Sequence, residues 1–195
     1  MKQFSESCVQ NQNPILNVIK PLLVNASTVL EIGSGTGQHA VFFAEQMPHL
    51  AWQASDQSQY LPSVNAWINE AGLDNLPSAI ELDVTEPWID TKVEAIFSAN
   101  TAHIMSWEMV VDFFNGVGRS LDTDGIFILY GPFNYNGQYT SQSNANFDLW
   151  LKGRDLRSAI RDFEALNQLA QKSGLSLVAD YAMPANNRIL HWVKK

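Results

Sequence analysis

An apolar, β-prone run that breaks into three alternating glycines constrains this chain more than any other stretch. It covers residues 29–37 and has the sequence V-L-E-I-G-S-G-T-G. Glycine enters backbone regions closed to other residues and, because it lacks a Cβ, lets a ligand approach the main chain. Helically spaced apolar residues follow, so the loop should lead into a helix N-terminus, whose unpaired N–H groups attract a carboxylate or phosphate. The stretch therefore predicts the first strand of an α/β sheet, ending in a cofactor loop.

The spacing of these glycines disfavours two common cofactor loops. The dinucleotide fingerprint needs glycine or alanine at its sixth position, where this chain, counted from Gly33, has the bulky Gln38. The phosphate loop of nucleoside triphosphatases ends in Gly-Lys-Ser or Gly-Lys-Thr, and no such ending follows. An acid two residues before G-x-G-x-G instead resembles the S-adenosylmethionine loop of class I methyltransferases. That resemblance implies this cofactor, with a binding site that includes Glu31, Gly33, Ser34, Gly35 and Gly37.

Further acids end the next two predicted strands. Asp56 closes the run 50–55, where a carboxylate can accept hydrogen bonds from both ribose hydroxyls, although capping the next helix is an alternative role. Asp83 lies in L-D-V-T and taken alone would be a strand-end turn residue. In class I methyltransferases such a residue and its neighbour, here Val84, hold the adenine amino group and ring. We assign Gln57 and Asn100 to the same cofactor site.

Composition limits the class of protein. The 195 residues fit one domain, residues 1–195, and 46% of them are hydrophobic, enough to fill a core on both faces of a sheet. The single Cys8 excludes an internal disulfide, and without an apolar leader among the first twenty residues we expect a cytoplasmic protein. A net charge of −8 repels phosphate backbones, which disfavours nucleic acid as a partner. We expect neither a membrane segment nor a metal site, and the sequence does not decide the oligomeric state.

The remaining pattern predicts a mostly parallel sheet between helices. Helices are expected from Asn13-Pro14, over 60–71, after Trp107 and over about 157–172, and strands over 79–82, 93–99 and 126–130, the last after a turn at 122–125. The last two strands, 175–181 and 188–193, must be antiparallel because the connection M-P-A-N-N is too short for the crossover that a parallel pair needs. We predict a three-layer α/β/α, Rossmann-like class I methyltransferase fold with a seven-stranded, mostly parallel sheet and an antiparallel C-terminal hairpin.

Two segments are expected to lie over the ligand. Residues 1–12 are polar and either are disordered or cover the cofactor, as the N-terminal segment does in many class I methyltransferases. Residues 131–155 are irregular yet contain aromatic residues, and they directly follow a central strand, which favours a substrate lid over a linker. Within this lid we consider Tyr135, Asp148 and Arg154 as residues for acceptor recognition.

Short motifs spread over nearly the whole chain point to one family. They are N-x-x-P-I-L from Asn11, G-T-G-Q-H-A from Gly35, W-Q-x-S-D from Trp52, L-D-V-T from Leu82, Y-G-P-F from Tyr130 and Y-T-S-Q-S-N from Tyr139, together with Phe147-Asp148 and Arg161-Asp162. The combination resembles the domain-of-unknown-function 938 family, a methyltransferase-like group. The chain departs from that family at Gln10, where Arg is expected, and in N-T-A-H-I-M-S-W, which keeps Asn100, His103 and Trp107 of the expected N-M-I-H-I-x-P-W.

The resemblance implies methyl transfer from S-adenosylmethionine to a small-molecule acceptor, with S-adenosylhomocysteine as product. Because the sulfonium is already activated, catalysis consists largely of alignment and exclusion of water. His103 is the first candidate for a general base, and a structural histidine at a helix start is the alternative. His39 lies either near the methionine carboxylate of the cofactor or on the solvated surface. A non-catalytic module that binds the cofactor and a partner protein is the alternative function, whereas Gln38 and the hairpin disfavour a nicotinamide reductase.

Overall fold

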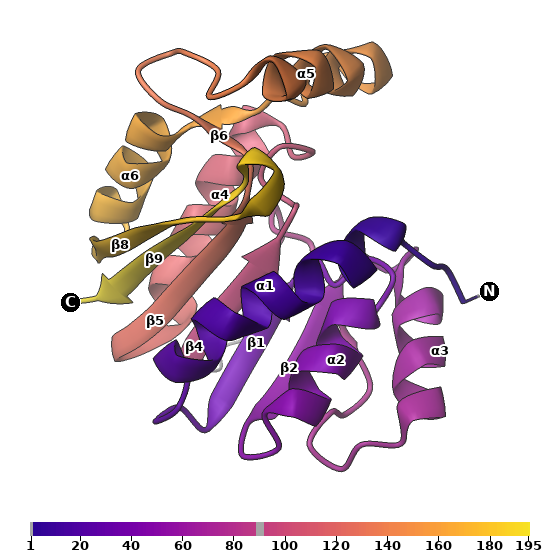
Figure 1. Ribbon diagram of the computed structural model, residues 1–195. Coiled ribbons are helices and arrows are strands. Elements are labelled where there is room, and N and C mark those ends of the chain that lie inside the picture. The colour runs from indigo at the N-terminus through magenta and orange to yellow at the C-terminus, as the bar shows by residue number, and fades with distance from the viewer. Residues whose placement is uncertain (1, 89–91) are drawn as a thin grey trace.

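The computed structural model describes residues 2–88 and 92–195, which form a three-layer α/β/α arrangement around one seven-stranded sheet (Figure 1). Across this sheet the strands follow the order β3-β2-β1-β4-β5-β9-β8. Five strands pair in parallel: β1 (Thr28–Ile32), β2 (Ala51–Asp56), β3 (Ile80–Glu81), β4 (Val93–Ala99) and β5 (Leu121–Gly131). The antiparallel hairpin of β8 (Leu175–Ala182) and β9 (Arg188–Lys194) completes the sheet at β5. The predicted fold class and closing hairpin are confirmed.

Helices cover both faces of the sheet because alternate strand residues point to opposite sides. On one face α1 (Glu6–Leu22), α2 (Gln38–Gln46) and α3 (Leu61–Ala71) pack over a core that includes Val29 of β1 (Figure 1). On the other, α4 (Trp107–Ser120) and α6 (Phe163–Lys172) pack over a core that includes the next residue, Leu30. Burial on both faces explains why the central strands are almost continuously apolar.

The strand order reverses beside β1, which pairs with β2 on one side and with β4 on the other. At such a switch point the chain leaves the two neighbouring strands in opposite directions, which opens a crevice at their carboxyl ends. The glycine loop after β1 and the segment after β4 therefore meet at one edge of the sheet. This edge is where a ligand site is expected in an open α/β sheet.

The predicted start of the first helix is wrong. Helix α1 begins at Glu6 rather than at Asn13, and Pro14 and Pro21 both lie inside it. The earlier start is stabilised by the side chain of Gln38, whose Oε1 accepts from the Ser5 N–H at 2.6 Å and whose Nε2 donates to the Ser5 carbonyl at 3.3 Å. The residue that is too large for a dinucleotide loop thus ties the beginning of α1 to the glycine loop.

Three further boundaries differ from the prediction. The expected turn at 122–125 lies within β5 as a bulge, since Val93 pairs with Leu121 and Ala95 with Ile126. The irregular segment 131–155 contains β6 (Phe133–Asn134) and a 13-residue helix, α5 (Gln142–Arg154). Helix α6 starts at Phe163 because the preceding β7 (Arg161–Asp162) pairs with β6. Across the described residues, no helix is both long and apolar enough to cross a membrane.

Candidate functional site

A cavity of about 1290 Å³ opens at the carboxyl edge of β1, β2 and β4. Its walls come from the glycine loop, the ends of β2 and β4, helices α1 and α5, and the connection between β8 and β9. Residues from both segments that were expected to lie over the ligand take part: Ser5, Cys8 and Asn11 from the N-terminus, and Asn144 and Phe147 from α5. The cavity therefore joins parts of the chain that lie far apart in sequence.

The three glycines of the loop all adopt a positive φ: 73° at Gly33, 58° at Gly35 and 96° at Gly37. Residues with a Cβ rarely adopt a positive φ, which explains why these three positions are glycine. Gly33 and Gly35 line the cavity, as does Ser34 between them. Gly37 does not; a Cβ there would lie 2.8 Å from the Cα of Val64, so this glycine allows close packing of α3.

Asp56 lies at the end of β2 and on the wall of the cavity. Its Oδ2 accepts a 2.6 Å hydrogen bond from the Gly35 N–H, and its Oδ1 accepts a 2.8 Å bond from the Gln57 N–H. Burial raises the pKa of Asp56, and the two backbone donors lower it. Because each carboxylate oxygen can accept more than one hydrogen bond, the oriented group can still bind hydroxyls of a ligand.

Glu31 does not reach the cavity surface. It is 2% exposed, and its Oε2 accepts hydrogen bonds from Ser34 Oγ at 2.9 Å and from Trp52 Nε1 at 3.1 Å. Burial raises the pKa of Glu31 to about 7. The structure thus places this predicted cofactor residue beneath the loop, where it supports Ser34 rather than facing a ligand.

Asp83 also lies outside the cavity lining, while its neighbours Leu82 and Val84 are part of it. The Asp83 carboxylate closes a turn by accepting from the Thr85 N–H at 2.9 Å, and it holds the Gln57 side chain through a 2.6 Å bond to Nε2. The Thr85 bonds lower the pKa of Asp83. Its contact with the site runs through Gln57, which does line the cavity.

His39 lines the cavity but is buried and engaged by α1 rather than solvated. Its Nε2 lies 2.7 Å from Asn11 Oδ1, and its ring stacks on Phe43. Burial lowers the pKa of His39 to about 4, so the imidazole is neutral at pH 7. Burial raises the pKa of the nearby Tyr130 hydroxyl, and the Asn11 side chain partly offsets this rise. Sequence reasoning missed Asn11 and Tyr130 as wall residues, although both start motifs of the family resemblance.

The segment after β4 brings Asn100 and His103 to the cavity. Asn100 has a φ of 61°, which asparagine tolerates better than most residues, and its N–H donates to the Tyr130 carbonyl at 2.9 Å. The His103 ring meets Phe147 edge-on, with 5.2 Å between ring centroids. Burial, reinforced by the charge of Arg161, lowers the pKa of His103 to about 4. His103 is thus a neutral imidazole on the cavity wall.

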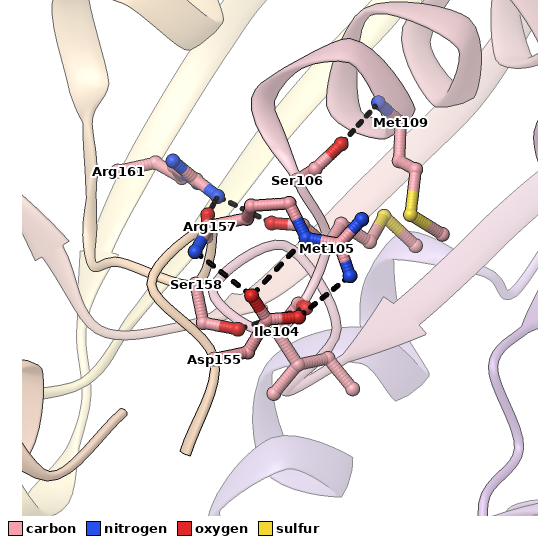
Figure 2. Close-up of polar contacts among 8 residues, drawn as sticks. All are labelled: Ile104, Met105, Ser106, Met109, Asp155, Arg157, Ser158 and Arg161. Carbon is pink, nitrogen blue, oxygen red and sulfur yellow. Dashed lines mark hydrogen bonds and ion pairs between the residues drawn. The ribbon is translucent and has the colours of Figure 1, made fainter. Parts of the chain in front are cut away.

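A strap formed by residues 158–161 holds the turn that carries His103 (Figure 2). Four consecutive carbonyls of this turn, those of residues 102–105, accept hydrogen bonds from the strap. Arg161 donates to the Ala102 carbonyl at 3.2 Å. It also donates to the carbonyls of Met105 and, at 2.8 Å, Arg157 (Figure 2). The Ser158 hydroxyl donates to the Ile104 carbonyl at 3.1 Å. The position of His103 is therefore set by the segment that follows α5, a link that involves the Arg161-Asp162 motif.

The three residues proposed for acceptor recognition occupy different places. Tyr135 and Asp148 do not line the cavity: the Tyr135 hydroxyl donates to Asp180 at 2.7 Å, and Asp148 is 1% exposed. The carboxylate of Asp148 accepts from the Ile160 N–H at 2.6 Å and pairs with Lys152, which fixes α5 to the strap. Arg154 does line the cavity, as do the unpredicted aromatic residues Phe147 and Trp150 of α5. Within the described residues, no three metal-ligating side chains lie together.

Comparison with known proteins places this geometry in context. A family model described as "Protein of unknown function (DUF938)" matches residues 2–194. Among solved structures, the mitomycin 7-O-methyltransferase MmcR is similar, with a TM-score of 0.84 and 16% identity over 97% of this chain and 54% of that chain. An O-methyltransferase family protein from Burkholderia thailandensis has a TM-score of 0.85 and 12% identity over 97% of this chain and 58% of that chain.

The S-adenosylmethionine-dependent methyltransferase SibL gives a similar result, with a TM-score of 0.81 and 18% identity over 96% of this chain and 55% of that chain. The present chain thus spans little more than half the length of each of these proteins. At such identities the likeness concerns the fold. It confirms the predicted Rossmann-like methyltransferase fold.

Proposed function

The chain belongs to the DUF938 family of proteins of unknown function, and we propose that it transfers a methyl group from S-adenosylmethionine to a small-molecule acceptor, leaving S-adenosylhomocysteine. One observation carries the proposal: the backbone of the glycine loop and the Asp56 carboxylate are joined at the wall of a large cavity. The fold shared with proteins named as methyltransferases supports this function.

The residues of this end of the cavity fit the cofactor chemically. Asp56 offers oriented carboxylate lone pairs for the two ribose hydroxyls. The apolar side chains of Leu82 and Val84 offer a surface for the adenine ring. The first N–H groups of α2 attract the methionine carboxylate, because the helix N-terminus carries partial positive charge. A Cβ on Gly35 would meet no protein atom within 4 Å, so the space beside this backbone can hold a ligand.

The chemistry needs little from the protein beyond placement. Bound S-adenosylmethionine supplies a methyl group that is already activated by a sulfonium sulfur. His103 is neutral at pH 7, so a ring nitrogen can accept a hydrogen bond from an acceptor hydroxyl. Its lowered pKa makes it a weak base, so it takes the proton only as the hydroxyl oxygen bonds to the methyl carbon and becomes strongly acidic. The strap fixes the turn that carries His103, and α1 and α5 form walls of the cavity. The residues of the chain thus orient the acceptor and handle its proton.

Transfer of labelled methyl groups tests this proposal. The purified protein is incubated with methyl-labelled S-adenosylmethionine and pools of small hydroxyl- and amine-bearing compounds, beside an Asp56→Ala variant. We expect label in a small-molecule product with the unmodified protein and much less with the variant. Tight binding of S-adenosylhomocysteine without transfer to any pool would instead favour a binding module that acts through a partner. Absence of both binding and transfer would overturn the cofactor assignment itself.

A further inference from the structure

The cavity is larger than a single ligand of cofactor size requires. Sites for one drug-sized ligand usually measure about 300–1,000 Å³, whereas this cavity measures about 1290 Å³. The residues assigned to the cofactor lie mainly at the ends of β1, β2 and β3. Part of the remaining wall comes from α5, the segment after β4 and the first turn of α4. We call this second part of the cavity, lined by Ile104, Met109, Phe147, Trp150 and Arg154, the acceptor compartment.

The acceptor compartment is mainly aromatic and apolar. The rings of Phe147 and Trp150 stack with their centroids 5.6 Å apart and their planes 18° from parallel. Trp150 remains 53% exposed and Ile104 58% exposed, although both line the cavity. Large apolar side chains that stay accessible inside a concave site offer contact area to a ligand. A flat ring can pack against the exposed part of the indole.

The compartment also contains one cationic group. Among the described residues that line either part of the cavity, Arg154 is the only Lys or Arg. Its guanidinium lies 4.8 Å from the Trp150 ring centroid, so the cation and the aromatic face are adjacent. The nearby carboxylate of Asp155 is taken by Arg157, through bonds of 3.1 Å to Oδ1 and 2.9 Å to Oδ2. A guanidinium in this setting is suited to a ligand carboxylate.

We propose that the methyl acceptor is a hydroxylated aromatic carboxylate. Its ring packs against the exposed part of Trp150, its carboxylate binds Arg154, and its hydroxyl approaches His103, whose ring lies edge-on to Phe147. The inference rests on the proposed methyl transfer, because it treats the second compartment as the acceptor site. The local cation is needed since the chain as a whole carries a charge of −8, which repels anions.

Binding of three matched probes tests this acceptor class without relying on turnover. Isothermal titration compares 6-hydroxy-2-naphthoate, its primary amide and 6-hydroxydecahydro-2-naphthoate, each added to protein saturated with S-adenosylhomocysteine. The amide removes the charge and the saturated acid removes the flat ring. We expect the hydroxynaphthoate to bind about tenfold more tightly than either analogue, as one charge-assisted contact or one stacked ring allows.

Two variants and a control assign the effect to residues. Arg154→Gln should reduce the affinity for the acid to that of the amide, and Trp150→Leu should remove the preference for the flat ring. Arg119→Gln makes the same change at an exposed residue that does not line the cavity, so it should leave the affinity for the acid unchanged. Melting curves check that each variant folds.

A separate titration with S-adenosylhomocysteine keeps the two proposals apart. If that ligand binds but the three naphthalene probes bind equally or not at all, the acceptor class is wrong while the cofactor site stands. An acid affinity that Arg154→Gln leaves unchanged would also overturn it. If S-adenosylhomocysteine does not bind, the proposed function fails, and the same probes are then compared on the protein alone, where equal affinities would overturn the acceptor class too.

Discussion

The backbone N–H of Gly35 donates a 2.6 Å hydrogen bond to Oδ2 of Asp56. This bond joins the loop after β1 to the end of β2, and the Gln57 N–H holds the other carboxylate oxygen at 2.8 Å. The acid is therefore oriented before any ligand arrives. Groups oriented in advance lose less conformational freedom on binding, which favours affinity.

Asp56→Asn should weaken binding of S-adenosylhomocysteine more than the matched change Asp83→Asn. The amide places an NH2 group where the carboxylate now accepts from two backbone donors, so one of these bonds is lost along with the charge. A hydrogen bond to a charged group contributes about 1.5–3 kcal/mol, equivalent to roughly 10–100-fold in affinity. Asp83 touches the site only through Gln57, so its change should cost less. Calorimetry measures both, and wild-type affinity in Asp56→Asn would remove the ribose assignment.

Features that depend on local sequence were predictable, whereas features that depend on distant partners were not. The positive φ angles of the glycines and the closing hairpin follow from residue type and connection length. Asp83 likewise keeps the turn role that its local sequence allows, because it closes a turn with Thr85. The direction of Glu31 does not follow from local sequence, because it is set by Trp52 of another element. The same holds in the predicted lid. Asp148 looks like a binding residue in the sequence until the Ile160 N–H, twelve residues away, occupies it.

Two alanine substitutions in the glycine loop should differ in what they weaken, one mainly the stability of the fold and the other mainly ligand binding. At Gly35 an added Cβ meets no protein atom within 4 Å, so alanine there costs about 1–2 kcal/mol of backbone strain and narrows the ligand space. At Gly37 the Cβ would also lie 2.8 Å from the Val64 backbone. We expect Gly37→Ala to lower the melting temperature more, and Gly35→Ala to lower the affinity for S-adenosylhomocysteine more. Equal melting temperatures and equal affinities in the two variants would contradict these roles.

Glu31 gives the folded protein a stability that depends on pH. Burial raises its pKa from 4.5 to about 7, so between these values the folded state binds the proton more tightly than the unfolded state. This contribution is complete below pH 4.5 and is lost as the pH rises through 7. The glutamine side chain of Glu31→Gln has no such proton to lose, so this contribution does not change with pH in the variant. The free energy of unfolding of the variant minus that of wild type should therefore increase by up to about 3 kcal/mol from pH 5 to pH 8.

Denaturant titrations at several pH values measure this difference. Burial lowers the pKa values of His39 and His103, which produces the opposite trend below pH 6.5, but both histidines are present in the two proteins and largely cancel in the comparison. A difference between Glu31→Gln and wild type that stays constant with pH would show that Glu31 titrates normally.

Removing the Arg161 side chain from the strap should reduce order in the turn that carries His103. Arg161→Met removes a charged donor from the carbonyls of Ala102 and Met105, so the His103 turn should open more often. We expect faster amide exchange at Ile104 and Met105, and a melting temperature lower by several degrees for a loss of about 1.5–3 kcal/mol. The pKa of His103 should rise, because the Arg161 charge helps to lower it.

Arg157→Met serves as the control for the strap. The Arg157 side chain pairs only with the partly exposed Asp155, so its removal should change amide exchange and melting very little. If the two variants behave alike, the strap does not set the position of His103.

The most direct measurement is a calorimetric titration of the unmodified protein with S-adenosylhomocysteine and, in a parallel cell, with NADH. We expect S-adenosylhomocysteine to bind at one site per chain and NADH to produce no heat beyond dilution, because Gln38 occupies the position that a dinucleotide loop keeps small. Binding of NADH without binding of S-adenosylhomocysteine would contradict the cofactor assignment.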